Sequence, residues 1–243
     1  MELSGKTALV TGAAKRVGRV IALALAKKGA HVLLHYRGSE TDAKQTASEI
    51  KALGVSCFLF KADLAKSADI RALLALIKEK GKTPDILVNS ASLYYKTPIE
   101  SADERQWDEL HDVNLKAPYL LSTAIGTEMA GGKGGKIVNI ADWSGFRPYK
   151  DYIAYCASKG GLITLTKSLA RDLAPKVYAN AVAPGPVLAP PDMDEKEKEA
   201  IAKTTALGKW GKPEDVANAV IFLLENDFMN GTVLTVDGGR SIV

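Results

Sequence analysis

Short aliphatic segments alternate with longer helical patterns from one end of this 243-residue chain to the other. The segments that predict strands are nearly all apolar, as strands covered on both faces of a sheet must be. They are Thr7–Val10, His31–His35, Ser56–Phe60, Ile86–Asn89, Lys136–Ile140, Tyr178–Val182 and Val233–Val236. Strands that alternate with helices in this way predict an α/β fold, with a parallel sheet flanked by helices on both faces.

The helical patterns lie between those strands and have recognisable ends. They cover Val17–Lys28, Thr41–Leu53, Ala68–Lys80, Glu104–Met129, Ala154–Leu173 and Pro213–Glu225. Asp103 and Lys212-Pro213 are typical helix starts, and Gly54 and Gly81 are typical helix ends. Because α/β domains often exceed about 200 residues, we expect residues 1–243 to form a single domain.

Two segments depart from the alternation. We expect Gly131–Gly135 to be a flexible link into the fifth strand. The segment Pro184–Leu207 begins with prolines that forbid a regular element early on, and its place after a strand end makes it a candidate substrate lid. The charged run Asp192–Glu199 within this lid segment is expected to be the solvated face of a helix.

Composition excludes several classes of protein. The net charge of +4 and the pI of about 8.9 suit polyanionic ligands but are too mild for a nucleic-acid-binding protein. No segment has the apolar length of a membrane-spanning or targeting region, so we expect a cytoplasmic protein with no membrane partner. Cys57 and Cys156 are expected to be reduced packing residues. The three histidines, His31, His35 and His111, lack metal-ligand spacing and predict no metal site.

A glycine loop, Thr11–Gly18, follows the first predicted strand directly. Glycine at the turn lets the backbone approach a phosphate, and the helix start presents free N–H groups with a partial positive charge. A loop between the first strand and the first helix predicts a Rossmann-type, doubly wound sheet of about seven strands that binds a dinucleotide. The candidate cofactor residues in the loop are Gly12, Lys15, Arg16, Val17 and Gly18.

The end of the second predicted strand indicates which dinucleotide is bound. Enzymes that prefer NAD usually carry an acid here for the ribose 2′-hydroxyl, but the residues are His35-Tyr36-Arg37-Gly38-Ser39. Arg37, Ser39 and Lys15 could bind a 2′-phosphate instead, because guanidinium matches phosphate geometry. We therefore predict NADPH, with Arg37 as a plain surface cation the alternative. Further cofactor contacts are expected from His35, Tyr36, Asp63, Leu64, Ser90, Ala91 and Ser92.

Tyr155 and Lys159 are spaced to share one face of a helix. A reductase must deliver a proton to the atom that becomes negative as hydride arrives. A phenol with an ordinary pKa of about 10 does this poorly near neutral pH, and a nearby ammonium lowers that pKa. We therefore expect Tyr155 to be the catalytic acid and Lys159 to lower its pKa while holding the nicotinamide ribose.

In this order the motifs resemble those of the short-chain dehydrogenase/reductase superfamily along essentially the whole chain. They are Thr11–Gly18, Asp63, Asn89–Ala91, Asn114, Tyr155 with Lys159, Pro184-Gly185 and Val236–Gly239. The resemblance implies hydride transfer from a nicotinamide, with Pro184 and Gly185 contacting the cofactor. It also implies that Asn114 holds a proton-relay water by bending the helix Glu104–Met129, and that the chain forms a homotetramer.

The departures from that pattern resemble the pteridine reductase branch of the superfamily. Arg16 stands where most members have glycine, and Asp142 where most have serine. A pterin is flat and could stack on Tyr94, although the branch carries phenylalanine there. Asp142 could relay protons through Tyr155 to a ring nitrogen, whereas a serine better suits a developing alkoxide. The predicted substrate residues are Arg16, Ser92, Tyr94, Asp142 and Tyr155.

These residues predict an NADPH-dependent reductase of a dihydropterin or dihydrofolate-like substrate, with Asp142, Tyr155, Lys159 and Asn114 as the catalytic set. Three plainer interpretations stay open: Asp142 as an exposed turn residue, Arg16 as a phosphate ligand alone, and Tyr94 as a packing aromatic. The alternative function is carbonyl reduction, for instance of a 3-oxoacyl carrier protein. A non-catalytic NADP(H)-binding sensor is a third possibility.

Overall fold

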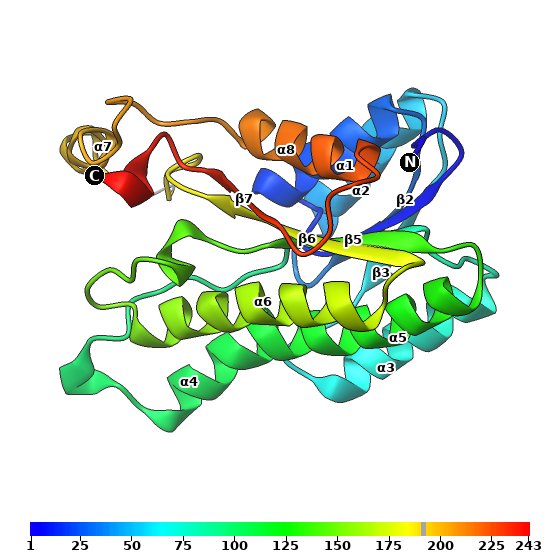
Figure 1. Cartoon of the computed structure of the whole chain (residues 1–243), viewed down its shortest axis with the longest axis horizontal. Coiled ribbons are helices and arrows are strands. Elements are labelled where there is room, and N and C mark those ends of the chain that lie inside the picture. Colours follow the sequence, from blue (N-terminus) through cyan, green and yellow to red (C-terminus); the bar gives the residue numbers. More distant parts are fainter. Residues whose placement is uncertain (191–192) are drawn as a thin grey trace.

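A seven-stranded parallel sheet forms the centre of the computed structural model, which describes residues 1–190 and 193–243 (Figure 1). Its order is β3-β2-β1-β4-β5-β6-β7. The strands are β1 (Thr7–Val10), β2 (His31–Tyr36), β3 (Cys57–Lys61), β4 (Ile86–Asn89), β5 (Gly135–Ile140), β6 (Val177–Pro184) and β7 (Val233–Val236). The predicted fold class is confirmed, and every predicted strand is present with ends that shift by at most two residues.

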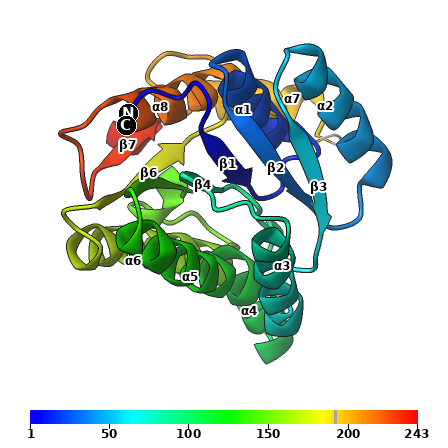
Figure 2. The ribbon, with the colours of Figure 1, turned by 90° about the vertical axis from the view of Figure 1, so that its right-hand side faces the viewer.

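Helices cover both faces of the sheet (Figure 2). One face carries α1 (Arg16–Lys27), α2 (Glu40–Ala52) and α8 (Pro213–Glu225), and the other carries α3 (Ser67–Glu79), α4 (Glu104–His111), α5 (Ala117–Gly131) and α6 (Ile153–Asp172). Within β1, Ala8 and Val10 pack into the core under α1 and α8, whereas Leu9 packs into the core on the opposite face. Both faces of each central strand are therefore buried, which explains the nearly continuous apolar runs.

The order of the strands determines where a ligand can bind. The chain leaves β1 toward β2 and β3 on one side, and β4 begins a second half on the other side. Loops that follow the carboxyl ends of β1 and β4 therefore diverge and leave a crevice at this switch point. The glycine loop after β1 and Ser90–Ser92 after β4 lie at that crevice.

A π-helix, Asp112–Lys116, divides the predicted helix Glu104–Met129. The backbone N–H of Ala117 bonds to the carbonyl of Asp112, one residue further back than in an α-helix. This wider turn contains Asn114 and interrupts the α-helical pattern at the place where we expected a bend. The helix then continues as α5 to Gly131, and Gly135 already belongs to β5, which reduces the predicted glycine link to residues 132–134.

The predicted lid segment, Pro184–Leu207, begins with the last residue of β6 and contains the short helix α7 (Glu195–Ala202). The described residues 185–190 form no helix or strand, as the prolines predicted. Asp194 caps α7 by accepting a hydrogen bond from the N–H of Glu197 at 2.8 Å, and no residue of α7 is buried, as expected for a solvated charged face. Residues 191–192, part of both the lid segment and the charged run, lie outside the described residues.

Among the described helices none is long and apolar enough to cross a membrane. The same residues hold no cluster of three His, Cys, Asp or Glu side chains suited to a metal ion. Cys57 and Cys156 are buried and free. Burial raises the pKa of the Cys57 thiol to about 11, which keeps it protonated and poorly nucleophilic.

Candidate active site

A cavity of about 980 Å³ opens at the carboxyl ends of the strands. All of the predicted cofactor and substrate residues line it, although they come from widely separated parts of the chain. These residues are Gly12, Lys15, Arg16, Val17, Gly18, His35, Tyr36, Arg37, Ser39, Asp63, Leu64, Ser90, Ala91, Ser92, Tyr94, Asp142, Tyr155, Lys159, Pro184 and Gly185. Of the predicted catalytic residues only Asn114 lies outside the lining, one position beyond Val113, which does line the cavity.

The glycine loop packs closely enough to need glycine at two positions. Gly12 has a φ of +65°, and a Cβ atom there would lie 2.9 Å from the Cα of Ala91. At Gly18 a Cβ atom would lie 2.4 Å from the carbonyl oxygen of Gly12. Lys15 precedes the first turn of α1 and offers no side-chain cap, and that turn contains no acidic residue. The helix start is therefore electrically and sterically suited to a phosphate group.

His35 organises the glycine loop from β2. Its Nδ1 accepts a hydrogen bond from the backbone N–H of Gly12 at 3.2 Å, and its Nε2 lies 3.1 Å from the carbonyl of Ala62. Burial lowers the pKa of His35 to about 4, so the ring is neutral and its proton sits on Nε2. Both ring nitrogens are used within the protein, so His35 shapes the cofactor site rather than offering a free donor to it.

The cavity wall directly after β2 carries a cation and no acid. Arg37 and Ser39 follow β2 and line the cavity, with Arg37 exposed. The first carboxylate after the strand, Glu40, does not line the cavity and forms an ion pair with Lys44 at 2.7 Å. Arg37 and Ser39 thus stand where an acid would bind the ribose 2′-hydroxyl. A cation and a hydroxyl at this place suit a 2′-phosphate.

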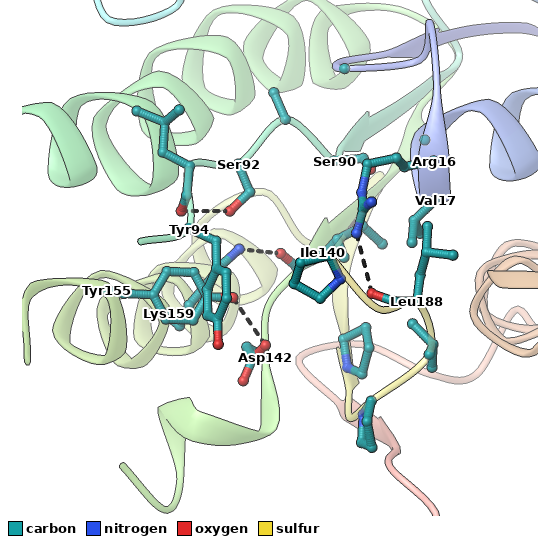
Figure 3. Close-up of a pocket in the computed structure, with 18 of the residues that line it drawn as sticks. Arg16, Val17, Ser90, Ser92, Tyr94, Ile140, Asp142, Tyr155, Lys159 and Leu188 are labelled. Carbon is teal, nitrogen blue, oxygen red and sulfur yellow. Dashed lines mark hydrogen bonds between the residues drawn. The ribbon is translucent and has the colours of Figure 1, made fainter. Parts of the chain in front are cut away.

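Arg16 adopts a left-handed backbone conformation, with a φ of +57°. Glycine, which most members of the superfamily that this chain resembles carry at this position, can adopt this conformation freely. From there its guanidinium crosses the cavity and donates to the carbonyls of Leu188, at 3.2 Å, and Ala189, at 3.5 Å (Figure 3). Arg16 therefore connects the glycine loop to the near end of the lid segment, a contact that the sequence did not predict.

Tyr155, Asp142 and Lys159 meet at the buried centre of the cavity (Figure 3). The phenol of Tyr155 donates a hydrogen bond to Oδ2 of Asp142 at 2.9 Å, and Oδ1 of Asp142 accepts one from the N–H of Ser144 at 2.8 Å. The Nζ of Lys159 lies 5.6 Å from the centre of the Tyr155 ring and donates to the carbonyl of Ile140 at 2.9 Å. Asp142 is thus no exposed turn residue.

Burial dominates the acidity of all three groups. It raises the pKa of Asp142, and together with the Asp142 charge it raises the pKa of Tyr155 well above the usual value. Burial also lowers the pKa of Lys159 to about 8. We expected Lys159 to lower the pKa of the phenol, but desolvation and the adjacent carboxylate shift it in the opposite direction. Tyr155 is therefore held protonated, as a hydrogen-bond donor to Asp142.

Asn114 lies behind this centre at the π-helix. Its Oδ1 accepts from the N–H of Leu93 at 2.8 Å and from the hydroxyl of Ser92 at 3.2 Å. Its Nδ2 donates to the carbonyl of Leu93 at 2.9 Å and to the hydroxyl of Ser158 at 3.2 Å. The amide is fully used in joining the loop after β4 to α6. The side chain of Asn114 therefore has no free hydrogen-bonding group left for the predicted relay water.

Trp143, Tyr149 and Tyr152, which sequence reasoning missed, line the cavity together with the predicted Tyr94 and Tyr155. Tyr94, which is 48% exposed, stacks on Tyr152 with ring centres 4.7 Å apart and meets Tyr155 edge-on at 4.9 Å. Tyr149 contacts Tyr152 and Trp143 at 5.1 and 5.3 Å. The available signal was the spacing of the tyrosines at 149, 152 and 155, which precede and open α6.

Comparison of the sequence with known families and proteins finds similar oxidoreductases over nearly the whole chain. A family model described as enoyl-(acyl carrier protein) reductase matches residues 12–241. The 3-oxoacyl-[acyl-carrier-protein] reductase FabG of Staphylococcus aureus is 34% identical over 241 residues, covering 96% of this chain and 97% of that protein.

Two solved structures are similar over nearly the whole chain. A blue fluorescent protein from a metagenomic library, in complex with NADPH, has a TM-score of 0.92 and 30% identity, and the match covers 99% of each chain. FolM alternative dihydrofolate reductase 1 from Brucella canis, complexed with NADP, has a TM-score of 0.93 and 28% identity, covering 100% of this chain and 96% of that one. Both structures hold NADP or NADPH, which confirms the predicted cofactor.

Proposed function

We propose that this chain, which belongs to the short-chain dehydrogenase/reductase superfamily and is an NADP-dependent oxidoreductase, reduces a C=N bond of a pteridine. The observation that carries the proposal is the buried hydrogen bond of 2.9 Å between Tyr155 and Asp142. Burial raises the pKa of this carboxyl, so it holds a proton more readily than an exposed aspartate and is a better proton carrier than the serine usual at this position. A substrate that must gain a proton on a ring nitrogen needs such a group.

The residues of the cavity fit NADPH. The uncapped start of α1 and the closely packed Gly12 suit the pyrophosphate, and Arg37 and Ser39 suit the 2′-phosphate. The buried ammonium of Lys159 is placed to hold the nicotinamide ribose. When bound, NADPH supplies the hydride.

The chain's own residues account for the proton. Tyr155 gives its phenolic proton to the substrate nitrogen that has gained negative charge. Asp142 is hydrogen-bonded to the same phenol and returns a proton to it. Solvent then protonates Asp142 again. The positive charge of Lys159 near the ring stabilises the phenolate while it exists. The half-exposed ring of Tyr94 supplies a flat apolar surface for a planar heteroaromatic.

A second candidate is reduction of a 3-oxoacyl thioester. The names of the curated relatives support it better than they support pteridine reduction, because FabG is a 3-oxoacyl-[acyl-carrier-protein] reductase. The similarity to FolM, an alternative dihydrofolate reductase, supports the pteridine. We favour the pteridine because the carboxyl hydrogen-bonded to Tyr155 offers a second proton-carrying group for a ring nitrogen, whereas hydroxyl donors alone suit the alkoxide that a ketone would form.

The two candidates are separated by one measurement on the purified enzyme. NADPH oxidation is followed with dihydrobiopterin, dihydrofolate and an acetoacetyl thioester side by side. Turnover of a pterin without turnover of the thioester supports the proposal. Turnover of the thioester alone contradicts it and leaves the carbonyl reductase.

We also propose that the chain assembles as a homotetramer. Large apolar side chains are exposed on α4 and α5, at Trp107 and Tyr119, and near α8, at Phe222 and Phe228. Exposed aromatics on helix surfaces commonly mark contacts between subunits. Light scattering of the protein in solution tests the assembly, and a monomeric mass contradicts it.

A further inference from the structure

The short C-terminal turn Arg240–Ile242 brings Arg240 to the wall of the cavity. Its position is fixed by the buried Asp237, whose two carboxylate oxygens accept hydrogen bonds from the N–H groups of Gly239, at 2.9 Å, and Ser241, at 2.7 Å. Gly239 has a φ of +79°, and a Cβ atom there would lie 2.7 Å from the Cβ of Ala206. The turn therefore packs tightly against the far end of the lid segment, so the backbone of Arg240 is held in one place.

The guanidinium of Arg240 stacks on the indole ring of Trp143, 4.6 Å from the ring centre. Among the described residues it makes no ion pair, and its side chain donates no hydrogen bond within the part of the chain that the structure describes. A guanidinium that stacks on a ring keeps its five N–H donors available at its edge. Within the described residues, the guanidinium of Arg240 thus has donors available at the cavity wall.

A line of aromatic contacts joins Arg240 to the catalytic phenol. The ring of Tyr155 lies 6.5 Å from that of Tyr149, and Tyr149 lies 5.3 Å from Trp143, on which Arg240 stacks. All of these residues line the same cavity. A planar group that reacts at Tyr155 therefore has a continuous aromatic wall beside it, and a cation lies at the other end of that wall.

Other charged side chains also line the cavity. Lys96 and Lys150 are exposed there, and the acids Asp151 and Glu197 line it too. Arg240 differs from the two lysines because the stacked ring and the capped turn hold its side chain in place. A fixed guanidinium recognises a carboxylate or phosphate with two parallel hydrogen bonds.

We propose that Arg240 binds an anionic tail of the substrate. The substrate would then be a ring that reacts at Tyr155 and carries a carboxylate- or phosphate-bearing side chain, rather than a ring with a neutral side chain. The identity of the ring as a pterin rests on the proposed function, whereas the recognition of the tail does not. Within that function, the inference favours a conjugated, folate-like pterin over an unconjugated one.

The test compares Arg240→Met with the wild type and with Arg171→Gln, a control that removes an exposed cation of α6 outside the cavity lining. Methionine keeps an apolar stem on Trp143 and removes the donors. The KM for dihydrofolate, which carries carboxylates, is expected to rise about 10- to 100-fold, the loss typical of a hydrogen-bonded charge pair. The KM for dihydrobiopterin, whose tail is neutral, should stay unchanged. Equal effects on both substrates, or no effect, overturn the inference.

A second pair of substrates separates this inference from the proposed function. If neither pterin is turned over, the proposed function fails. The KM for acetoacetyl-CoA is then compared with the KM for the neutral acetoacetyl-N-acetylcysteamine.

A binding measurement tests the same preference without turnover. Dissociation constants for folate and biopterin are measured by tryptophan fluorescence with NADP present. In each pair the wild type should prefer the anionic ligand and Arg240→Met should lose that preference. Absence of the preference in the wild type contradicts the role of Arg240.

Discussion

The phenol of Tyr155 donates its hydrogen bond to Asp142, which is itself fixed by the N–H of Ser144. Replacement of Asp142 by serine restores the usual hydroxyl of the superfamily and removes the carboxyl that carries the proton. We expect Asp142→Ser to lower kcat for a pterin by about 100-fold or more, within the usual contribution of a general acid. Activity on an acetoacetyl thioester should stay the same or rise, because the phenol loses a neighbour that raises its pKa.

Asp142→Asn provides the matched control, since it keeps an acceptor for Tyr155 and Ser144 but carries no proton. It should lose pterin turnover while its thermal unfolding stays close to that of the wild type. The proton-relay role is contradicted if the asparagine variant retains wild-type pterin turnover.

Arg37 is expected to discriminate NADPH from NADH. Arg37→Ala removes a cation from the end of β2, so the KM for NADPH should rise about 10- to 100-fold, as expected for the loss of hydrogen bonds to a charged group. The KM for NADH should hardly change. Lys44→Ala also removes one cation, the partner of Glu40, and serves as a charge-matched control. An equal rise in the KM for both cofactors would mean that Arg37 supports the fold and does not recognise the 2′-phosphate.

The neutral imidazole of His35 makes stability depend on pH. Its pKa falls from 6.5 in the unfolded chain to about 4 in the folded protein because the ring is buried. Below about pH 6.5 the unfolded state binds a proton at His35 that the folded state does not bind. The free energy of unfolding therefore falls as the pH drops and levels off below the folded pKa. The full loss is about 3 kcal/mol, and above pH 6.5 the group has no effect.

Chemical denaturation between pH 4 and 7 checks this slope. His35→Asn should flatten it, because asparagine does not titrate in this range. His111→Gln, on α4 and outside the cavity lining, should leave it unchanged. Equal slopes in the wild type and the His35 variant would show that other groups carry the pH dependence.

Arg16 tests the connection between the glycine loop and the lid segment. Arg16→Gly accepts the φ of +57° without strain, which stabilises the loop by about 1 kcal/mol, but it removes the hydrogen bonds to Leu188 and Ala189. Hydrogen exchange at the amides of Val187, Leu188 and Ala189 should accelerate, while exchange in β1 should not. Lys15→Gly, at the neighbouring position, is the control. Unchanged exchange near Leu188 contradicts the connection.

The fold and much of the site were predictable because their causes are local. Apolar runs such as Ile86–Asn89 reveal buried parallel strands, and a glycine between β1 and α1 reveals a phosphate loop. Parallel strands all end at one edge, so residues that follow them, such as Asp142 and Ser92, had to converge there. The interruption of the helix at Asn114 lies where the resemblance to the superfamily implied an irregularity.

The missed features depend on contacts between distant segments. Tyr152 stacks on Tyr94, and Arg240 stacks on Trp143. Neither contact produces a regular spacing in the sequence from which it could be predicted. The pKa of Tyr155 was misjudged for a related reason. The spacing to Lys159 shows in the sequence, whereas the burial that outweighs the lysine appears only in the folded protein.

The glycine loop is already ordered by the protein alone, through His35 at Gly12 and the hydroxyl of Thr46 at the carbonyl of Ala14. A dinucleotide therefore meets a preorganised receptor, and its affinity is not reduced by the entropy of folding a loop around it. Discrimination between NADPH and NADH then falls to the exposed Arg37 at the rim. Cofactor preference in this protein should consequently be open to redesign at that rim without disturbing the rest of the fold.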